Sequence, residues 1–156
     1  MNTTANEADE TPEFSITRTF DAPRELVWRA WTEESQLAHW LHPFGVSNDS
    51  LAFDVRVGGE YRYTMTNDET GERFPTAGSY LEVEPFERLV FTWGDPGASI
   101  EDAPVITLTF TEQGDGTELL FHLRGYAGKP GDGFVYDGWD EALTNFGKHL
   151  AGEPLA

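Results

Sequence analysis

Near its C-terminal end the sequence reads Trp139-Asp-Glu-Ala-Leu-Thr-Asn-Phe-Gly-Lys-His-Leu150, and this stretch decides the fold. Its large apolar residues recur at spacings of four, three and four: Trp139, Leu143, Phe146 and Leu150. Because an α-helix turns once in about 3.6 residues, these side chains share one face. The stretch therefore predicts an amphipathic helix of about three turns, whose apolar face must be covered by another element.

Six segments before this helix have the patterns of strands, with turn residues between them. They cover residues 50–54, 59–67, 73–83, 88–93, 105–113 and 116–125. Their short connections imply antiparallel neighbours. Two sets of alternate residues are candidates for the concave face of the sheet: Tyr61, Tyr63 and Met65, and Leu119, Phe121 and Leu123.

The N-terminal part adds one strand and two short helices. Residues 14–20 alternate apolar and polar side chains, as a half-buried strand does. Pro23 suits the first turn of a helix. The apolar face expected for that helix consists of Leu26, Val27, Ala30 and Trp31, and a second helix presents Leu37, Trp40 and Leu41. A run of strands followed by one long helix predicts an α+β fold.

The length of 156 residues suits one domain. Apolar residues recur without a linker-like gap from Phe14 onward, so we expect a single domain over residues 13–152. Residues 1–12 contain no large apolar side chain except Met1 and include several carboxylates. Such a segment cannot repay the entropy lost on ordering, and we expect a flexible acidic tail.

The composition argues against several classes of protein. There is no run of about 20 apolar residues and no basic-then-apolar N-terminus, so we expect a cytoplasmic protein. The absence of cysteine fits that location and excludes disulfides, thiolate nucleophiles and cysteine-ligated zinc. The formal charge of −18 would repel nucleic acid and anionic membranes. Adaptation to a salty cytoplasm and ordinary solubility both explain this charge.

Five stretches of sequence carry a resemblance to a known family. They read Phe20-Asp-Ala-Pro-Arg-Glu-Leu-Val-Trp28, Leu37-Ala-His-Trp40, Gly58-Gly-Glu-Tyr-Arg62, Glu84-Pro-Phe-Glu-Arg-Leu-Val-Phe-Thr-Trp93 and Gly116-Thr-Glu-Leu119. From about Phe14 to Leu150 the chain resembles the activator of heat-shock protein 90 ATPase homologues, in their single-domain prokaryotic form. That family belongs to the START-like (SRPBCC) superfamily, which includes the birch-pollen allergen. The resemblance implies a helix-grip fold, in which a curved antiparallel sheet surrounds the long C-terminal helix and a cavity lies between them.

The resemblance leaves the use of the cavity open, because the superfamily includes lipid and hormone carriers, polyketide aromatase/cyclases and the co-chaperone domain. The chain also departs from the family at two places. Leu41 and His42 follow Trp40 where the family often has a second tryptophan and a glycine. Leu123 stands where the family often has a histidine. If Leu123 faces the cavity, a polar group has been lost there, which favours apolar cargo over catalysis.

Nine apolar or aromatic residues are candidates for lining the cavity, although membership of the plain core explains each of them equally well. They are Trp40, Tyr61, Tyr63, Met65, Phe121, Leu123, Trp139, Leu143 and Phe146. A dry void of about 300 Å³ would cost roughly 7 kcal/mol, which is comparable to the net stability of a domain. We therefore expect the site to hold a ligand or water, or to be partly collapsed.

Metal and catalytic sites are weakly indicated. His39 and His42 are close enough on a helix to share a metal ion, but no third ligand is evident. His122 is expected to point away from the cavity, and Ser79 and Ser99 lie in no recognised nucleophile setting. The adjacent aspartate rules out residues 131–133 as a phosphate loop. We expect neither a metal nor a cofactor.

Four further residues offer an acid–base set if they reach the cavity: Arg62, Arg124, Tyr80 and Glu82. The plainer roles are those of solvated strand residues for the arginines and of a cross-strand or edge pair for Tyr80 and Glu82.

Three functions follow from these observations. The first is non-catalytic binding of a small hydrophobic molecule in the cavity. The second is a cyclase or hydrolase that uses the same cavity and needs at least two titratable side chains pointing inward. The third is a chaperone-associated interaction domain, which ranks last because the chain lacks the extra domain of the eukaryotic activator. A homodimer remains open.

Overall fold

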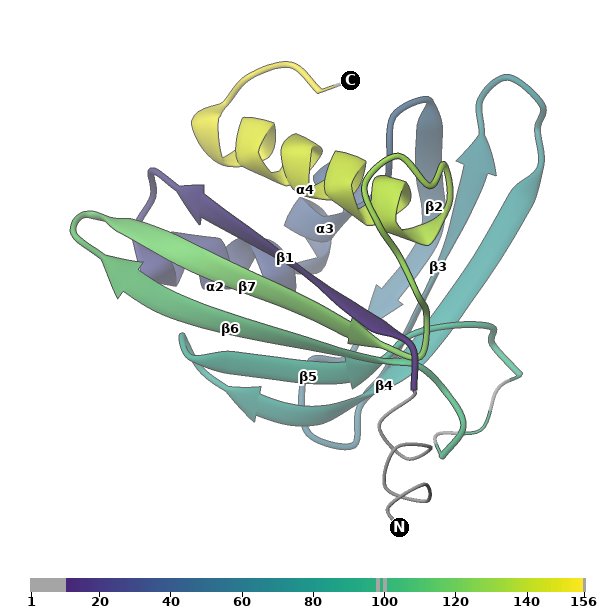
Figure 1. Ribbon diagram of the computed structural model, residues 1–156, viewed down its shortest axis with the longest axis horizontal. Coiled ribbons are helices and arrows are strands. Elements are labelled where there is room, and N and C mark those ends of the chain that lie inside the picture. Colours follow the sequence, from purple (N-terminus) through teal and green to yellow (C-terminus); the bar gives the residue numbers. More distant parts are fainter. Residues whose placement is uncertain (1–10, 98, 100, 156) are drawn as a thin grey trace, which may run out of the picture.

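A computed structural model of the protein describes residues 11–97, 99 and 101–155 (Figure 1). The elements follow the predicted order of strand, two short helices, six strands and long helix. The strands are β1 (Glu13–Phe20), β2 (Val46–Phe53), β3 (Glu60–Asn67), β4 (Arg73–Glu84), β5 (Arg88–Thr92), β6 (Val105–Gln113) and β7 (Gly116–Arg124). The helices are α2 (Arg24–Thr32), α3 (Glu34–Trp40) and α4 (Val135–Ala151). Residues 1–10 of the predicted tail lie outside the described residues.

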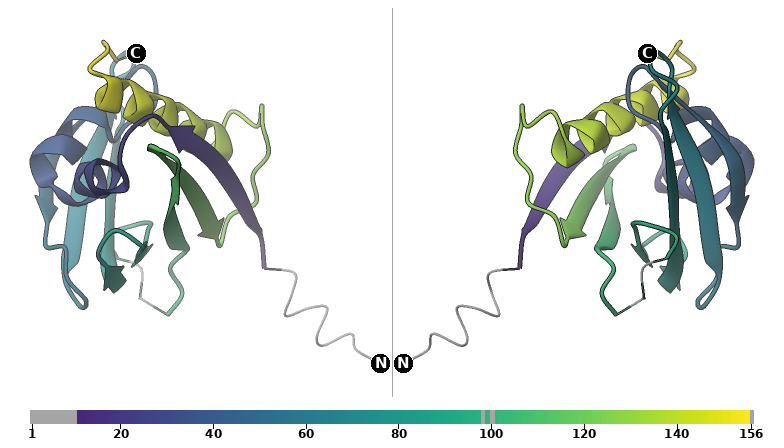
Figure 2. Two further views of the ribbon diagram at one scale, coloured as in Figure 1. Left: turned by 90° about the vertical axis from the view of Figure 1, so that its left-hand side faces the viewer. Right: turned by 90° about the vertical axis from the view of Figure 1, so that its right-hand side faces the viewer.

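The seven strands form one antiparallel sheet in the order β1-β7-β6-β5-β4-β3-β2. The sheet is strongly curved, and α4 lies across its concave side (Figures 1 and 2). α2 and α3 connect the two edge strands, β1 and β2, and both helices contact α4. This arrangement is a helix-grip fold of the α+β class. No helix in the described part of the chain is long and apolar enough to cross a membrane.

The C-terminal half of α4 is packed tightly against the rest of the protein. Leu143 and Phe146 are fully buried. The ring of Phe146 lies 4.9 Å from that of Phe20 and 4.6 Å from that of Trp40, measured between centroids. Trp31 approaches the same ring at 5.6 Å. Aromatic contacts of this kind add to the free energy gained by burying apolar surface, so this cluster anchors the helix.

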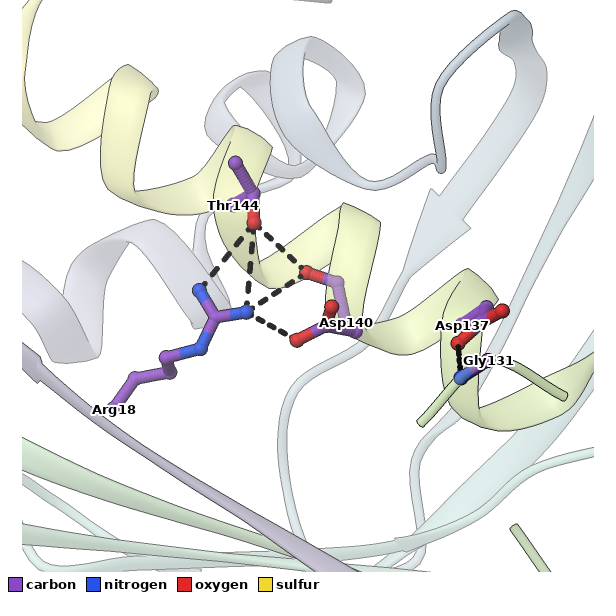
Figure 3. Close-up of polar contacts among 5 residues, drawn as sticks. All are labelled: Arg18, Gly131, Asp137, Asp140 and Thr144. Carbon is purple, nitrogen blue, oxygen red and sulfur yellow. Dashed lines mark hydrogen bonds and ion pairs between the residues drawn. The ribbon is translucent and has the colours of Figure 1, made fainter. Parts of the chain in front are cut away.

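Two aspartates determine where α4 begins. Asp132 accepts hydrogen bonds from the backbone N–H groups of Phe134 at 2.8 Å and Asp137 at 3.2 Å, groups that lack a partner within the helix. Asp137 in turn accepts from the backbone N–H groups of Gly131 at 2.9 Å and Gly133 at 2.7 Å; Figure 3 shows the first of these contacts. The residues 131–133 and the first turn of α4 therefore hold each other in place.

Arg18 ties the edge strand β1 to the middle of α4 (Figure 3). Its guanidinium forms an ion pair with the carboxylate of Asp140 and donates to the backbone carbonyl of that residue at 3.2 Å. It also donates to the hydroxyl oxygen of Thr144 at 3.4 Å. Charge-assisted hydrogen bonds of this type fix geometry well, so α4 is held at its centre as well as at its C-terminal half.

The structure differs from the sequence-based predictions at α2 and β2. Leu26 was expected on the buried face of the first helix, but it is 47% exposed and Trp28 is buried instead. The ring of Trp28 packs 5.4 Å from that of Phe110, and so large a side chain decides the rotation of a short helix. β2 begins at Val46, before the predicted residue 50. Its first residues are mostly polar and its register shifts near Ser50, so they lack the alternation of apolar and polar side chains from which a strand is predicted.

Three buried tyrosines lie on the concave side of β3 and β4: Tyr61, Tyr63 and Tyr80. Tyr61 donates a hydrogen bond to the backbone carbonyl of Thr92 at 2.6 Å. Burial raises the pKa of Tyr63 to about 12. Burial also raises the pKa values of Tyr61 and Tyr80 well above that of an exposed tyrosine, because ionised phenols are poorly solvated there.

Replacing a leucine that anchors α4 should destabilise the protein, whereas replacing an exposed helical leucine should not. We expect Leu143→Ala to lower the free energy of unfolding by about 2–5 kcal/mol, because Leu143 is fully buried. The matched control is Leu26→Ala, also in a helix, which should change it by no more than about 0.5 kcal/mol. Urea unfolding of both variants measures the difference, and equal effects would contradict the packing described for α4.

The raised pKa values of the three buried tyrosines predict that the protein loses stability at alkaline pH. In the unfolded chain they ionise near pH 10, whereas in the folded protein they stay protonated to higher pH. Above about pH 10 the unfolded state therefore binds fewer protons. Their contribution is complete below that pH and is lost as the pH rises toward about 12, the pKa of folded Tyr63.

Urea unfolding at about pH 9, 10 and 11 tests this prediction. The free energy of unfolding should fall over that interval, and Tyr63→Phe should reduce the fall because one titrating group is removed. A slope that Tyr63→Phe leaves unchanged would show that other groups cause the alkaline instability.

Candidate functional site

A cavity of about 550 Å³ lies between the sheet and the N-terminal half of α4. The helix contributes four residues to it, at the spacing of one helical face: Val135, Gly138, Trp139 and Ala142. Two of the four are small. A Cβ atom added to Gly138 would meet no heavy atom within 4 Å. The cavity therefore exists in part because the helix has small residues where it faces the sheet.

The wall opposite α4 is largely aromatic. Tyr63 and Met65 project from β3, while Trp93 follows β5 and Tyr126 follows β7. The indole N–H of Trp93 donates to the hydroxyl oxygen of Tyr63 at 3.1 Å. The ring of Trp93 lies 5.6 Å from that of Trp139 and 5.8 Å from that of Tyr126. These side chains present flat apolar faces whose polar atoms are partly engaged with one another.

Two large apolar side chains at the cavity are exposed to solvent. Phe74 on β4 and Phe134 at the start of α4 both line the cavity and are 40% and 70% exposed. Pro43 and Pro75 also belong to the lining. The cavity thus opens to solvent between exposed phenylalanine rings, and an apolar molecule that entered there would also cover them.

Three charged or basic side chains line the cavity: Arg73 and His42, which are engaged with other groups, and the exposed Asp95. Arg73 forms an ion pair with Asp49 at 3.1 Å and donates to the hydroxyl of Thr66 at 3.3 Å. The hydrogen bond from Arg73 lowers the pKa of the Asp49 carboxyl. The two ring nitrogens of His42 lie 3.0 Å from the carbonyl oxygen of Pro43 and 3.2 Å from that of His39.

A second cavity of about 20 Å³ adjoins the first and offers room for about one water molecule. Four side chains border both cavities: Leu41, Tyr63, Trp93 and Trp139. Trp31 borders the small cavity only, and its ring stacks on that of Trp139 at 6.4 Å. The indole N–H groups of Trp31 and Trp139 are both buried without a hydrogen-bond partner.

The structure places the nine predicted cavity residues in three settings. Those that line the main cavity are Tyr63, Met65 and Trp139, and Tyr61 borders the small one. The remaining five are fully buried and border neither cavity: Trp40, Phe121, Leu123, Leu143 and Phe146. Periodicity shows which side of an element faces inward, but not where along that side the packing is dense. Leu123 does not face the main cavity. The leucine at this position, where the family often has a histidine, therefore does not show whether the cavity holds apolar cargo.

Sequence reasoning missed most of the cavity wall. The missed residues are Val135, Gly138, Ala142, Trp93, Gly94, Asp95, Tyr126, Phe74, Pro75, Thr76, Phe134, Pro43, Leu41, His42 and Arg73. Two of the helical residues carried a usable signal, because Gly138 and Ala142 are small residues on an otherwise bulky apolar face. Tyr126 and Phe134 lie beyond the ends of regular elements, where no periodicity applies, and Trp93 follows β5 although the predicted strand 88–93 included it.

Of the histidines, His42 lines the main cavity. His39, His122 and His149 lie outside its wall and contact other side chains. The Nδ1 atoms of His39 and His149 lie 2.7 Å apart. Burial, and secondarily the nearby His39, lower the pKa of His149. His122 lies 2.7 Å from a carboxylate oxygen of Glu13. Within residues 11–97, 99 and 101–155, no three metal-ligating side chains come together.

The four residues weighed as an acid–base set do not meet in the main cavity. Arg62 and Arg124 are exposed on their strands. Glu82 forms an ion pair with Arg88 at 3.2 Å rather than with Tyr80. Tyr80 is buried and borders only the small cavity.

Comparison with solved structures supports the fold. A protein from Chromobacterium violaceum is 29% identical, with a TM-score of 0.75 over 86% of this chain and 94% of that one. A protein from Arthrobacter aurescens is 22% identical, with a TM-score of 0.79 over 94% of this chain and 90% of that one. An AHSA1-like protein from Aeromonas hydrophila is 22% identical, with a TM-score of 0.74 over 90% of this chain and 92% of that one.

Comparison with protein families gives a specific assignment. No curated protein matches the sequence. The model of one family, described as Activator of Hsp90 ATPase homolog 1-like protein, matches residues 21–151. That match spans both short helices, β2 to β7 and α4, which together build both cavities. The chain therefore belongs to the family of Activator of Hsp90 ATPase homolog 1-like proteins.

Proposed function

We propose that the protein binds one small hydrophobic molecule in the main cavity, between α4 and the sheet, and that no catalysis is required. The observation that supports this most strongly is the cavity itself. Its volume of about 550 Å³ falls within the range of about 300–1,000 Å³ that is usual for small-molecule sites. Its wall is mostly aromatic and aliphatic, with few polar groups, as such sites commonly are.

The exposed rings at the mouth give a driving force for binding. Phe134 is 70% exposed, and Phe74 is 40% exposed. Removing apolar surface from water is worth about 25 cal/mol per Å². A ligand that fills the cavity and reaches the mouth covers both rings as well as the faces of Trp93 and Tyr126, so its binding removes apolar surface on both sides of the contact.

The cyclase or hydrolase alternative uses the same cavity and remains a second hypothesis. It requires at least two titratable groups that are free to exchange protons with a substrate. His42 and Arg73 line the cavity, but their polar atoms already contact backbone carbonyls or Asp49, so the exposed Asp95 offers the one carboxylate of the lining. Binding without turnover therefore needs fewer rearrangements. Product analysis after prolonged incubation with any ligand found would reveal a reaction.

The chaperone-associated alternative rests on the family description alone. Stimulation of a chaperone ATPase by the purified protein would support it, and the absence of stimulation and of co-purification would remove it. We keep the cytoplasm as the proposed location because the chain has no cysteine. A homodimer stays a proposal that sedimentation analysis can test.

A thermal-shift panel tests the proposed function. We expect one class among fatty acids, sterols, flavonoids and polyketide-like aromatics to raise the melting temperature. A ligand at about a hundred times its dissociation constant adds about 2.7 kcal/mol, which corresponds to a shift of several degrees for a domain of this size. Intrinsic fluorescence should change for the same ligands, since Trp93 and Trp139 line the cavity.

A variant with a filled cavity shows whether binding occurs at this site. Gly138 lies within α4, and the space beyond it is open. We expect Gly138→Leu to project into the cavity and to abolish the shift. The matched control, Gly138→Ala, should keep it, while gaining up to about 1 kcal/mol in stability from its higher helix propensity. If both variants respond as the unaltered protein does, the ligand binds elsewhere. If no class responds, the proposed function is wrong and a protein partner becomes the leading explanation.

A further inference from the structure

We infer that the molecule bound in the main cavity carries a protonated amine, and that this ammonium group lies beside the carboxylate of Asp95, where the cavity meets solvent. The inference rests on the proposed function and adds the chemical class of the ligand, an apolar amine. It follows from the side of the sheet on which Asp95 lies, from its lack of a partner, and from the charges around the cavity.

The pairing of β4 with the chain after β5 fixes the position of Asp95. Beyond the end of β5, Ala77 and Gly94 form an antiparallel bridge, with backbone N–H to carbonyl distances of 3.0 Å and 3.2 Å in the two directions. This bridge keeps the register of the pair Tyr80 and Phe91 within the two strands. The extended chain that carries Asp95 therefore continues β5 alongside β4.

Alternation along this extended chain places Asp95 on the concave face of the sheet. Side chains two positions apart in a strand point to the same face, so Phe91, Trp93 and Asp95 form one row. Phe91 borders the small cavity, and Trp93 borders both cavities. Thr76, which stands opposite Asp95 in this register, also lines the main cavity. Asp95 is thus the last member of a row of side chains that faces the cavities.

The carboxylate of Asp95 is accessible and has no counter-charge. Asp95 is exposed, and no hydrogen bond or ion pair joins it to another group within residues 11–97, 99 and 101–155. The guanidinium of Arg73 also belongs to the lining, but it is engaged with Asp49 at 3.1 Å and with the hydroxyl of Thr66 at 3.3 Å. An ammonium group on the ligand would therefore meet a carboxylate for which the protein itself supplies no cation.

The charge of the whole chain acts in the same direction. The formal charge is −18, and the two lysines, Lys129 and Lys148, do not belong to the lining of the main cavity. A field of this sign attracts cations and repels anions. An apolar carboxylate, such as a fatty acid, would approach against both the overall charge and Asp95.

The inner end of the site indicates where the charge of the ligand must lie. No charged side chain borders the small cavity, and burying a charge away from water and counter-ions is unfavourable. The apolar part of the ligand therefore suits the inner wall, which includes Trp93 and Trp139. The ammonium group suits the exposed end, where water and Asp95 both remain within reach.

Two plainer explanations compete with a specific role for Asp95. An exposed carboxylate is common on any protein surface and need not contact a ligand. Alternatively, the overall charge alone would attract an amine. Glu101 offers a matched control for both, because it is exposed and lies in the same connection between β5 and β6 but does not line the main cavity. Asp95→Asn and Glu101→Gln each remove one negative charge, and only the first alters the cavity.

Three probes with one aromatic body test the inference. At neutral pH pyrenylmethylamine is a cation, pyrenylmethanol is neutral and pyrenecarboxylate is an anion. Transfer of tryptophan excitation to pyrene gives the three dissociation constants for the full chain. We expect the amine to bind about two- to fivefold more tightly than the alcohol, as one exposed ion pair allows, and the carboxylate to bind more weakly than the alcohol. Equal affinities for the amine and the alcohol overturn the inference.

The two variants separate a local contact from the overall field. In Asp95→Asn the preference for the amine over the alcohol should largely vanish, while the affinity for the alcohol stays unchanged. In Glu101→Gln the preference should persist. Both positions are exposed, so both variants are expected to fold, and thermal unfolding checks this. A preference that persists in Asp95→Asn, or that falls equally in both variants, overturns the inference.

Salt gives a second readout that needs no variant. Raising the ionic strength from about 0.1 M to about 1 M shortens the screening length from about 10 Å to about 3 Å. The preference for the amine over the alcohol should then fall toward one, because the pair with Asp95 is exposed. A preference that is unchanged in molar salt contradicts a charge contact at this position.

The outcome for the proposed function is separate. If pyrenylmethanol binds, and Gly138→Leu blocks it, the cavity is a binding site whether or not the amine is preferred. If none of the three probes and no compound of the panel binds, the proposed function fails and the inference fails with it.

Discussion

The rest of this structure depends on one interaction, the packing of the C-terminal half of α4 against β1, α2 and α3. Phe146 is enclosed by Phe20, Trp31 and Trp40, so the helix is fixed at one end of the concave face. Arg18 holds its centre through Asp140 and Thr144, as Figure 3 shows. The N-terminal half then passes over the sheet with small residues facing it, and the main cavity results. A helix packed tightly along its whole length would leave no site.

The site combines a largely apolar wall with few polar groups. The C-terminal anchor also positions the cavity edge, because the buried Asn145 donates its side-chain N–H to the carbonyl of His42 at 3.0 Å. Trp139 links the two cavities and carries one of the unsatisfied indole N–H groups. The surroundings of Trp139 contain hydroxyls and indoles rather than charges, which suits the apolar part of a ligand.

Much of the fold could be predicted from sequence because it depends on periodicity. The spacing of Trp139, Leu143 and Phe146 identified α4 and its inward face, and the alternation in β3 identified Tyr63. The cavity could be predicted only in part, because periodicity does not distinguish a residue in dense core from one beside a void. Phe146 and Trp139 share a helical face, yet only Trp139 reaches the cavity. The loop residues of the wall, such as Tyr126, depend on tertiary contacts that no local pattern encodes.

The most direct test of the central claim is a two-dimensional ¹⁵N–¹H NMR titration that follows the indole N–H resonances as a ligand from the panel is added. Trp93 and Trp139 line the cavity, whereas Trp40 is buried in the core and donates to a backbone carbonyl. The account predicts that the resonances of Trp93 and Trp139 shift progressively to saturation while that of Trp40 stays in place. Saturable binding that leaves Trp93 and Trp139 unchanged would contradict it, because the ligand would then lie outside the cavity.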